Sequence, residues 1–460
     1  MKRFLLFAMG ALCIAGCADD SRTYYNGVVR ELSSEEYFGR SNYGDGNVKA
    51  ATYIISQLQE MGVEPLQATT DVTNAAYPQD KSAVMPCSAA RFEDADASVQ
   101  AYLQNFCVPM NVMRGQMAVS VDGEPLTPTV NFTAKEFSPT CHGDFGVAYL
   151  DDAYYTPQEF CRHLNSGDYA DKFVVVDWHK YLTRLKPNPM EKYLHFMMPL
   201  DKVGGLIMKD TDQFPYFKAR TYYTLKMPVL MVDGSFPDNA QRIRVDIDSE
   251  MLPSHDCHNV VAAIKGAKHP DKYITFIAHF DHLGLMGDGV VFPGANDNAS
   301  GVAMLLSLAR YYSKHQPDCS LQFIFLDAEE NNLLGAFYYA ENPRVPLDDI
   351  GFLFNFDMIG DDGDKLVCQV SEEGEAGFEL FRKLNDKSKH PAELALEPVD
   401  DNSDHFAFAL KGVPCAYFEW EGNMYQYYHT PEDTFDHASD ANFQRLFDLT
   451  IKFVSKFRLK

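Results

Sequence analysis

The chain is predicted to be an α/β protein, with a mixed, mostly parallel sheet covered by helices on both faces and a β-rich inserted domain. Strand-like and helix-like segments alternate along its C-terminal half, which favours such a sheet. The middle of the chain contains short apolar runs separated by turn residues, and the N-terminal part shows helical periodicity. Hydrophobic residues make up 46% and charged residues 23% of 460 residues. This composition is that of a globular chain, and its length exceeds what one ordinary domain needs.

The first 17 residues form a separate segment typical of export. Lys2 and Arg3 precede an apolar run from Phe4 to Ile14, which is too short to span a membrane as a helix. The run ends in Ile14-Ala15-Gly16-Cys17, which resembles a lipobox, the recognition site for bacterial lipoprotein processing. The resemblance implies cleavage before Cys17 and lipidation of that cysteine. We therefore expect an exported bacterial lipoprotein, tethered to a membrane by lipid and facing the periplasm or the cell surface. An ordinary secretory signal with an incidental cysteine is the alternative.

Export also permits disulfides among the remaining cysteines. Cys87 with Cys107 and Cys141 with Cys161 are candidate local pairs. Spacing alone leaves their connectivity open.

The charge balance excludes one class of partner. Acidic side chains number 65 against 40 basic ones, and the net charge is -25. Nucleic acid is excluded as a partner because its phosphates would be repelled. The simplest interpretation of the charge is that it maintains solubility.

Residues 22–86 are predicted to be the N-terminal helical part of the main domain. Val28, Val29 and Leu32 share one helical face, and a second helix is expected from Val48 to Met61. Gly62 ends it. A turn is expected between the two helices, at residues 38–41.

Residues 87–240 are predicted to form the inserted domain. Short apolar runs alternate there with turn residues, which indicates a compact β-rich unit. Its pattern and position resemble a protease-associated domain, and an elaborated set of loops on one core is the alternative. The runs are Gly146 to Leu150, Phe173 to Val176, Gly205 to Met208 and Val229 to Val232.

Residues 250–460 carry the strand–helix alternation. The predicted strands are Asn259–Ile264, Tyr273–Ala278, Gln322–Leu326, Phe352–Phe356 and Cys415–Phe418. The predicted helices are Ala299–Tyr312, Leu333–Ala340, Glu375–Asn385 and Ala441–Phe457. The alternation indicates a mostly parallel sheet.

Polar side chains follow several of these strands at their carboxyl ends, where open α/β sheets bind ligands. His279 follows one strand, Glu330 another and Asp357 a third, while His429 lies in the loop after the last. Asp297 directly precedes the longest clear helix of this region. Each residue alone is better explained structurally, as a loop histidine, a helix cap or a solvated acid. Their coincidence at one sheet edge predicts a site.

Two histidines and several carboxylates suit zinc, which takes nitrogen and oxygen ligands. One carboxylate can bridge two metal ions. Asp297 is the natural bridge, with His279 and Asp357 completing one site and Glu330 and His429 the other. We therefore expect two zinc ions per chain.

Two further carboxylates are expected to act beside the ligands. Asp281, two residues after His279, can accept the second ring N–H of that histidine and orient it. Glu329, adjacent to Glu330, can take a proton from the attacking water and deliver it to the leaving amine. The alternatives are a solvated loop acid and a surface carboxylate.

Six ordered motifs resemble those of the two-zinc aminopeptidase and glutamate-carboxypeptidase family of metallopeptidases, which includes bacterial leucyl aminopeptidases. The likeness extends from about Val260 to the C-terminus. It implies the zinc exopeptidase fold, the five ligands assigned above and Glu329 as general base. The motifs are His279-Phe280-Asp281-His282-Leu283-Gly284, Asn296-Asp297-Asn298-Ala299-Ser300-Gly301, Ala328-Glu329-Glu330, Phe356-Asp357-Met358-Ile359-Gly360, Ser403-Asp404-His405 and Tyr428-His429-Thr430-Pro431-Glu432-Asp433-Thr434.

The resemblance also places Asp404 and His405 near the site, where they position substrate or support the site as a loop network. His282 is interpreted as a loop histidine. The predicted activity is release of N-terminal residues from peptides by metal-activated water. A glutamate-type carboxypeptidase, a one-zinc glutaminyl cyclase-like acyltransferase and a non-catalytic surface binding protein are the alternatives.

Overall fold

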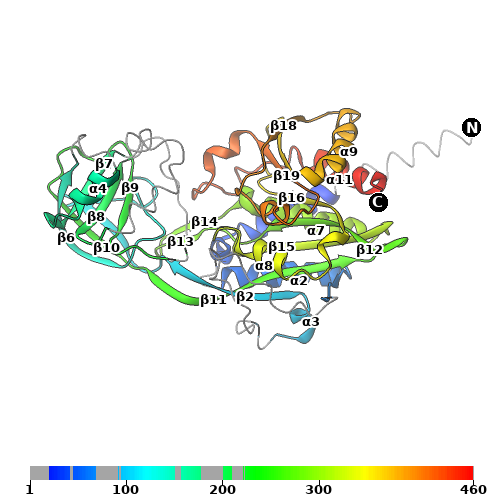
Figure 1. Cartoon of the computed structure of the whole chain (residues 1–460), viewed down its shortest axis with the longest axis horizontal. Helices are drawn as coiled ribbons and strands as arrows, with labels where there is room; N and C mark the ends of the chain where they lie inside the picture. The colour runs from blue at the N-terminus through cyan, green and yellow to red at the C-terminus, as the bar shows by residue number, and fades with distance from the viewer. Residues whose placement is uncertain are drawn as a thin grey trace, which may run out of the picture.

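The computed structural model describes residues 20–41, 45–68, 92, 95–150, 157–177, 200–209, 221 and 223–458. The predicted signal segment, with Cys17, lies outside these residues, as does Cys87. Within the described part of the chain, no helix has the length and apolar character needed to cross a membrane. The described residues form two lobes, a larger one built on one long sheet and a smaller one built on a second sheet (Figure 1).

The larger lobe contains a nine-stranded sheet in the order β1-β11-β15-β12-β16-β19-β17-β18, with β2 also paired to β11. The four central strands, β15, β12, β16 and β19, are parallel to one another. Antiparallel pairs flank them, β11 with β15 and β17 with β19. The prediction of a mixed, mostly parallel sheet is confirmed. The strand bounds are β1 Glu64–Pro65, β2 Leu103–Val112, β11 Glu250–Ile264, β12 His269–His279, β15 Cys319–Leu326, β16 Ile350–Phe356, β17 Lys365–Val370, β18 Glu393–Glu397 and β19 Cys415–Glu421.

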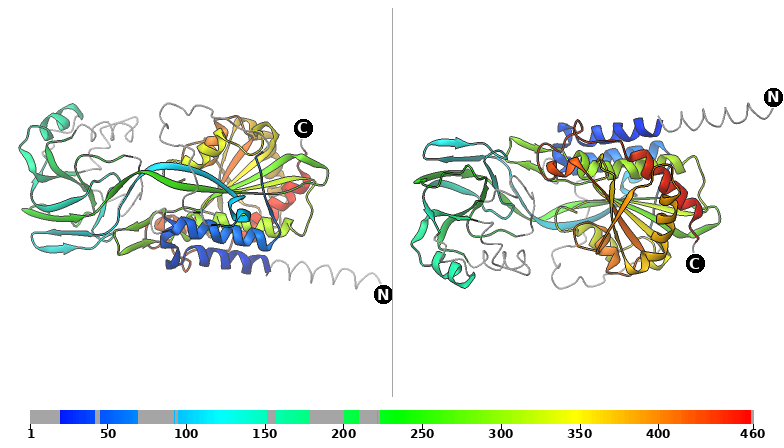
Figure 2. Two further views of the ribbon diagram at one scale, coloured as in Figure 1. Left: turned by 90° about the horizontal axis from the view of Figure 1, so that it is seen from below. Right: turned by 90° about the horizontal axis from the view of Figure 1, so that it is seen from above.

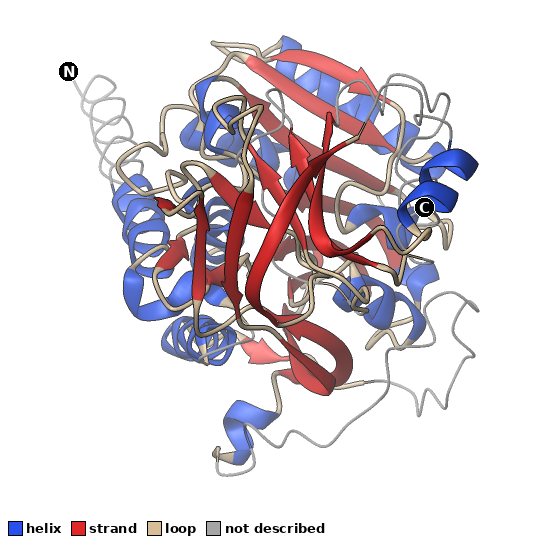
Figure 3. Cartoon of the chain, turned by 90° about the vertical axis from the view of Figure 1, so that its left-hand side faces the viewer, coloured by secondary structure: helices blue, strands red, loops and turns tan. Residues whose placement is uncertain are grey.

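Helices cover both faces of this sheet because its central strands are apolar on both sides (Figures 2 and 3). All eight residues of β15 are buried. One core joins alternate residues of the strands, such as Phe276 and Phe354, to α2, α7, α9 and α11. The other core joins the intervening residues, such as Ile277 and Leu353, to α8 and α10. The helix bounds are α2 Gly46–Glu60, α7 Gly301–Tyr312, α8 Leu334–Glu341, α9 Glu375–Asp386, α10 His405–Ala409 and α11 Phe443–Lys456.

The predicted elements of this lobe correspond closely to the observed ones. Each predicted strand lies within an observed strand, and the predicted helices correspond to α2, α7, α8, α9 and α11. Strands β1, β2, β17 and β18 and the short helix α10 were not predicted. Residues 20–32 form the expected first helix.

The smaller lobe is an eight-stranded sheet in the order β4-β3-β10-β6-β7-β8-β9-β5, with cores of its own on its two faces. Its strands are β3 Met117–Val121, β4 Glu124–Leu126, β5 Phe132–Ala134, β6 Cys141–Tyr149, β7 Tyr169–Asp177, β8 Val203–Lys209, β9 Val229–Val232 and β10 Arg242–Ile247. The helix α4, Pro157–Leu164, packs on one face.

The two lobes are joined by the long antiparallel pair β2 and β11, which runs from one to the other (Figure 1). Strand β2 pairs with the larger sheet, although it falls inside the predicted insert of residues 87–240. Strand β10 belongs to the smaller sheet, although it falls beyond that range.

Among the candidate disulfides, the pairing of Cys141 with Cys161 is wrong, because neither cysteine is disulfide-bonded in the structure. Cys107 is disulfide-bonded, and its partner lies outside the described residues.

Candidate metal centre

The carboxyl ends of the central strands bring the predicted site residues together. Strand β12 ends at His279, and Asp357 directly follows β16. Glu330 follows β15 by four residues, and His429 follows the short helix η8, Asn423–Tyr427, beyond β19. Asp297 lies in η5, Ala295–Ser300, immediately before α7. All five side chains are buried, each with less than 6% of its surface exposed.

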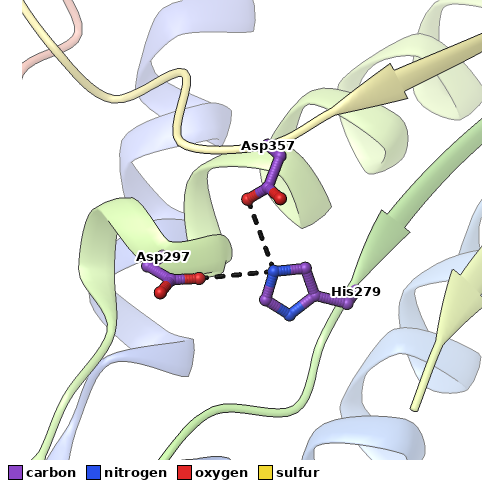
Figure 4. A group of neighbouring side chains, drawn as sticks. All are labelled: His279, Asp297 and Asp357. Carbon is purple, nitrogen blue, oxygen red and sulfur yellow. Dashed lines mark ion pairs between the residues drawn. The ribbon is translucent and has the colours of Figure 1, made fainter. Parts of the chain in front are cut away.

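The first group of ligand atoms converges on His279 (Figure 4). Its Nε2 atom lies 3.3 Å from Oδ1 of Asp297 and 3.3 Å from Oδ1 of Asp357. Its Nδ1–H donates to the backbone carbonyl of Asp281 at 3.0 Å. In the neutral imidazole, Nε2 therefore carries a lone pair that faces two carboxylate oxygens. Such a buried arrangement is repulsive without a cation and well suited to a divalent metal ion.

The second group forms around the other oxygen of Asp297. The Nε2 atom of His429 lies 3.2 Å from Oδ2 of Asp297 and 3.4 Å from Oε2 of Glu330. Asp297 thus directs Oδ1 toward His279 and Oδ2 toward His429. This is the relationship expected of a carboxylate shared between two metal ions.

His282 is a member of this cluster. From the sequence alone, it is interpreted as a loop histidine without a role in the site. It is fully buried, and its Nδ1–H donates to Oε1 of Glu330 at 2.8 Å. Asp297, Glu330 and His282 form one of the two groups of side chains close enough to share a metal ion. Because its Nδ1 proton is engaged by Glu330, His282 orients that carboxylate. The signal in the sequence was its position, three residues after His279.

Asp281 supports the site in a different way from the predicted one. Its backbone carbonyl, not its carboxylate, is hydrogen-bonded to His279, and its Oδ1 lies 3.8 Å from the ring. The carboxylate instead accepts the backbone N–H groups of Glu329 at 3.0 Å and Glu330 at 3.4 Å. Asp281 thereby fixes both the orientation of His279 and the turn that presents the two glutamates.

Glu329 lies at the open side of the cluster. Its carboxylate is 3.9 Å from Nε2 of His279 and retains 11% side-chain exposure. Burial raises the pKa of Glu329 well above its ordinary value, and the nearby carboxylates of Glu330 and Asp404 add to this effect. A raised pKa makes the ionised carboxylate a stronger proton acceptor, as a general base must be.

The charged groups of the cluster also shift the pKa values of His279 and Asp297. Burial opposes a charged imidazole, but the carboxylates of Glu329 and Asp357 outweigh it and raise the pKa of His279 well above 6.5. Burial also opposes a charged Asp297, but His282 and the two flanking histidines hold its pKa well below 3.8. The cluster therefore keeps positive and negative groups together, and a bound cation would replace the protons on the histidines.

The loop carrying Asp297 is held by two residues to which the sequence interpretation assigned no role. The carboxylate of Asp433 accepts the backbone N–H of Asn296 at 2.8 Å and that of Asp297 at 3.0 Å. Arg40 is fully buried, and its guanidinium donates hydrogen bonds to five backbone carbonyls. Those carbonyls belong to Leu32, Phe280, Pro293, Gly294 and Asp297.

Residues 403–405 lie next to the cluster, on the side away from the cavity. The hydroxyl of Ser403 donates to Oδ2 of Asp357 at 2.6 Å and so orients this ligand. Asp404 is fully buried, and burial raises its pKa well above the ordinary value. His405 is bonded through Nε2 to Gln369 at 3.0 Å, and burial lowers its pKa to about 3. Neither Asp404 nor His405 lines the cavity beside the cluster, so their place is one of support.

A cavity of about 140 Å³ opens next to the cluster. Its inner end is formed by ligand side chains and Glu329, and its outer walls by polar and aromatic side chains. Those outer residues are Met358, Asn402, Tyr417, Glu419, Tyr425 and Tyr428.

A doubly covered sheet thus presents two buried groups of nitrogen and oxygen atoms, joined by one carboxylate, beside a cavity, and this arrangement is suited to binding metal ions. Residues 259–454, which carry the site, match Peptidase family M28.

Curated relatives resemble this part of the chain. Aminopeptidase YwaD of Bacillus subtilis is 32% identical over 195 residues, which cover 40% of this chain and 41% of the relative. Probable leucine aminopeptidase 2 of Aspergillus oryzae is 32% identical over 168 residues, 34% of this chain and 32% of the relative. The chain thus matches less than half the length of these relatives.

Solved structures resemble nearly the whole chain. A zinc aminopeptidase from Bacillus subtilis has a TM-score of 0.64 at 19% identity and covers 94% of each chain. The Peptidase M28 precursor from Shewanella amazonensis has a TM-score of 0.66 at 17% identity and covers 97% of each chain. At these identities the likeness concerns the fold alone.

Proposed function

We propose that this protein is a zinc-dependent aminopeptidase that removes N-terminal residues from peptides with two zinc ions. The observation that carries the proposal is the division of the Asp297 carboxylate between the His279 and His429 groups, at 3.3 and 3.2 Å. The named zinc aminopeptidases among the relatives support it. Bound zinc ions would lower the pKa of a water molecule and polarise the scissile carbonyl.

The chain's own residues supply the proton transfer. Glu329 lies at the boundary between the ligand cluster and the cavity, where an attacking water and a peptide nitrogen can both reach it. Its carboxylate accepts the proton of the water and returns it to the departing nitrogen. Asp281 holds Glu329 in place through the backbone N–H of that residue.

The charge of the cavity favours attack at the amino end of a peptide. Asp297, Glu329, Asp357 and Glu419 line it, and neither lysine nor arginine is among the described residues of its lining. A carboxypeptidase needs a cation for the terminal carboxylate, whereas a free α-amine is attracted by these acids.

A panel of matched peptides tests the proposal. Purified protein loaded with zinc is offered peptides with free and acetylated N-termini, and the products and zinc content are measured. We expect release of N-terminal residues only from free peptides, with two zinc ions per chain. Cleavage from the carboxyl end, cyclisation of N-terminal glutamine with one zinc ion, or no turnover would contradict the proposal.

Two substitutions separate the roles of base and ligand. Glu329→Gln should keep both zinc ions and reduce turnover by about 10²–10⁴-fold. Asp297→Ala should lose zinc as well as turnover. Near-normal turnover in the Glu329 variant would show that another group carries the proton.

We also propose that the enzyme is tethered to a membrane through lipid on Cys17, on the basis of the lipobox-like sequence Ile14-Ala15-Gly16-Cys17. Expression of the full chain in a bacterial host should give protein that partitions into Triton X-114 and incorporates labelled palmitate. Cys17→Ser should abolish both, while Cys141→Ser, which alters a free thiol elsewhere, should not. Aqueous partitioning of the unaltered protein would contradict the anchor.

A further inference from the structure

One acidic side chain in the cavity wall, Glu419, is neither a member of a ligand group nor the proposed general base. Glu419 lies on β19, directly after Phe418, which pairs with Phe356 at the end of β16. Asp357 follows Phe356, and its N–H donates to the carbonyl of Phe418 at 3.2 Å. The strand register therefore places Glu419 beside the ligand cluster, at the same sheet edge.

The negative charge of Glu419 is not balanced by a cation. In the described part of the chain, no lysine or arginine lies within ion-pair distance of Glu419, whose carboxylate accepts the hydroxyl of Tyr417 at 2.6 Å. By contrast, Glu421, two residues along the same strand, is paired with Lys365 at 2.5 Å. Burial raises the pKa of Glu419 to about 7, which marks a site where an incoming cation would be favourable.

An aromatic surface connects Glu419 with the ligand cluster. Tyr428 lies against His429 with 3.9 Å between ring centroids, and Tyr425 stacks on Tyr428 at 5.6 Å and 13°. Tyr425 keeps 59% of its surface exposed at the cavity mouth. Aromatic faces of this kind pack against methylene chains and attract cations. Glu419, Tyr425 and Tyr428 line the same cavity, so the acid and this surface lie close together.

We propose that Glu419, Tyr417 and the Tyr425–Tyr428 stack form the pocket for the side chain of the substrate's N-terminal residue, and that this pocket selects lysine and arginine. This inference rests on the proposed aminopeptidase function. The aliphatic part of the substrate side chain lies along the tyrosine rings, and its terminal cation pairs with the Glu419 carboxylate.

The alternative role for Glu419 is to bind the α-amine. The α-amine adjoins the scissile bond, so it must lie near Glu329 and the metal ligands, where carboxylates are already present. The side-chain cation of lysine is four methylenes further away, which matches a carboxylate in the outer wall.

The test compares lysine with norleucine, which has the same aliphatic chain but no charge. The kcat/KM for Lys- and norleucine-p-nitroanilide is measured for the zinc-loaded protein and for Glu419→Gln, which keeps the size of the side chain. We expect the unaltered protein to prefer lysine by about ten- to a hundredfold, and the variant to lose most of this preference. Glu421→Gln removes a charge from the same face of β19 and should leave the ratio within about twofold.

Two results would overturn the proposal. An unchanged ratio in Glu419→Gln would show that this carboxylate does not contact the substrate side chain. An equal loss of kcat/KM on both substrates would mean that Glu419 binds the α-amine or only maintains the shape of the cavity wall.

A protein inactive on both substrates would contradict the aminopeptidase function, and binding then tests the pocket separately. Calorimetric titration with lysinamide and norleucinamide should show at least about tenfold tighter binding of lysinamide to the zinc-loaded protein. Glu419→Gln should remove that difference. Equal binding of the two amides to the unaltered protein would contradict the proposal that the pocket selects lysine and arginine.

Discussion

The two carboxylate oxygens of Asp433 hold the loop of Asp297 by its backbone, with Oδ2 accepting the N–H of Asp297 at 3.0 Å. Oδ1 accepts the neighbouring N–H of Asn296 at 2.8 Å. Asp433 lies four residues after His429, so one loop supplies both a ligand and the support of the bridging carboxylate. The two halves of the metal centre are thereby coupled through the backbone.

Asp433→Asn should weaken metal binding without removing a ligand. The amide presents an N–H₂ group to one of the two backbone donors, so one buried hydrogen bond is lost. We expect metal affinity to fall by about 10–100-fold, measured by competition with a chromogenic chelator. Glu432→Gln changes the exposed neighbour and should have no effect. Unchanged affinity in the Asp433 variant would mean that the loop holds its shape without this residue.

His282→Ala tests whether this histidine orients Glu330 or binds metal itself. If it orients Glu330 through the 2.8 Å contact, metal affinity falls by about 10–100-fold, and excess zinc restores both the second ion and turnover. His429→Ala should lose the second ion even with excess zinc. His315→Ala, at an exposed helix end, is the matched control. Failure of excess zinc to rescue the His282 variant would make His282 a ligand.

Arg40→Met should destabilise the fold strongly. Its guanidinium is fully buried and donates to five backbone carbonyls, which would lose these hydrogen bonds. The expected loss is about 3–5 kcal/mol in the free energy of unfolding, measured by urea denaturation. Arg30→Met is the control, because Arg30 is exposed and lies over the ring of Phe435. A loss as small as that of the control would show that water replaces the missing donors.

The metal-free protein should lose stability as pH rises above about 6.5, the ordinary pKa of histidine. Glu329, Asp404 and His279 have folded-state pKa values raised well above their ordinary ones. Groups of this kind contribute stability at low pH and lose it as pH rises through the folded-state pKa. His405, with a lowered pKa, acts in the opposite sense only below its ordinary value of 6.5.

Bound zinc should cancel this dependence, since a cation favours the ionised carboxylates and neutral histidines. Thermal unfolding of chelator-treated and zinc-loaded protein across this range should therefore diverge as pH rises. A constant difference between the two Tm curves would contradict the assigned pKa shifts.

The sequence by itself determined the fold class and the positions of the candidate ligands. Long apolar runs such as Cys319–Leu326 are buried on both faces, so their pattern alone indicates central parallel strands, and parallel strands bring their carboxyl ends to one edge. His279, Asp297, Glu330, Asp357 and His429 were predicted for that reason, and the structure brings all five together.

Only the tertiary structure decided which residues support and surround them. Arg40 and Asp433 act from segments more than 130 residues away from Asp297 in the chain, and no local pattern marks such a partner. The roles of His282 and Glu419 depend on which way a side chain points within a buried loop or a strand. Periodicity records burial and local conformation, whereas hydrogen bonds between distant segments exist only after those segments pack.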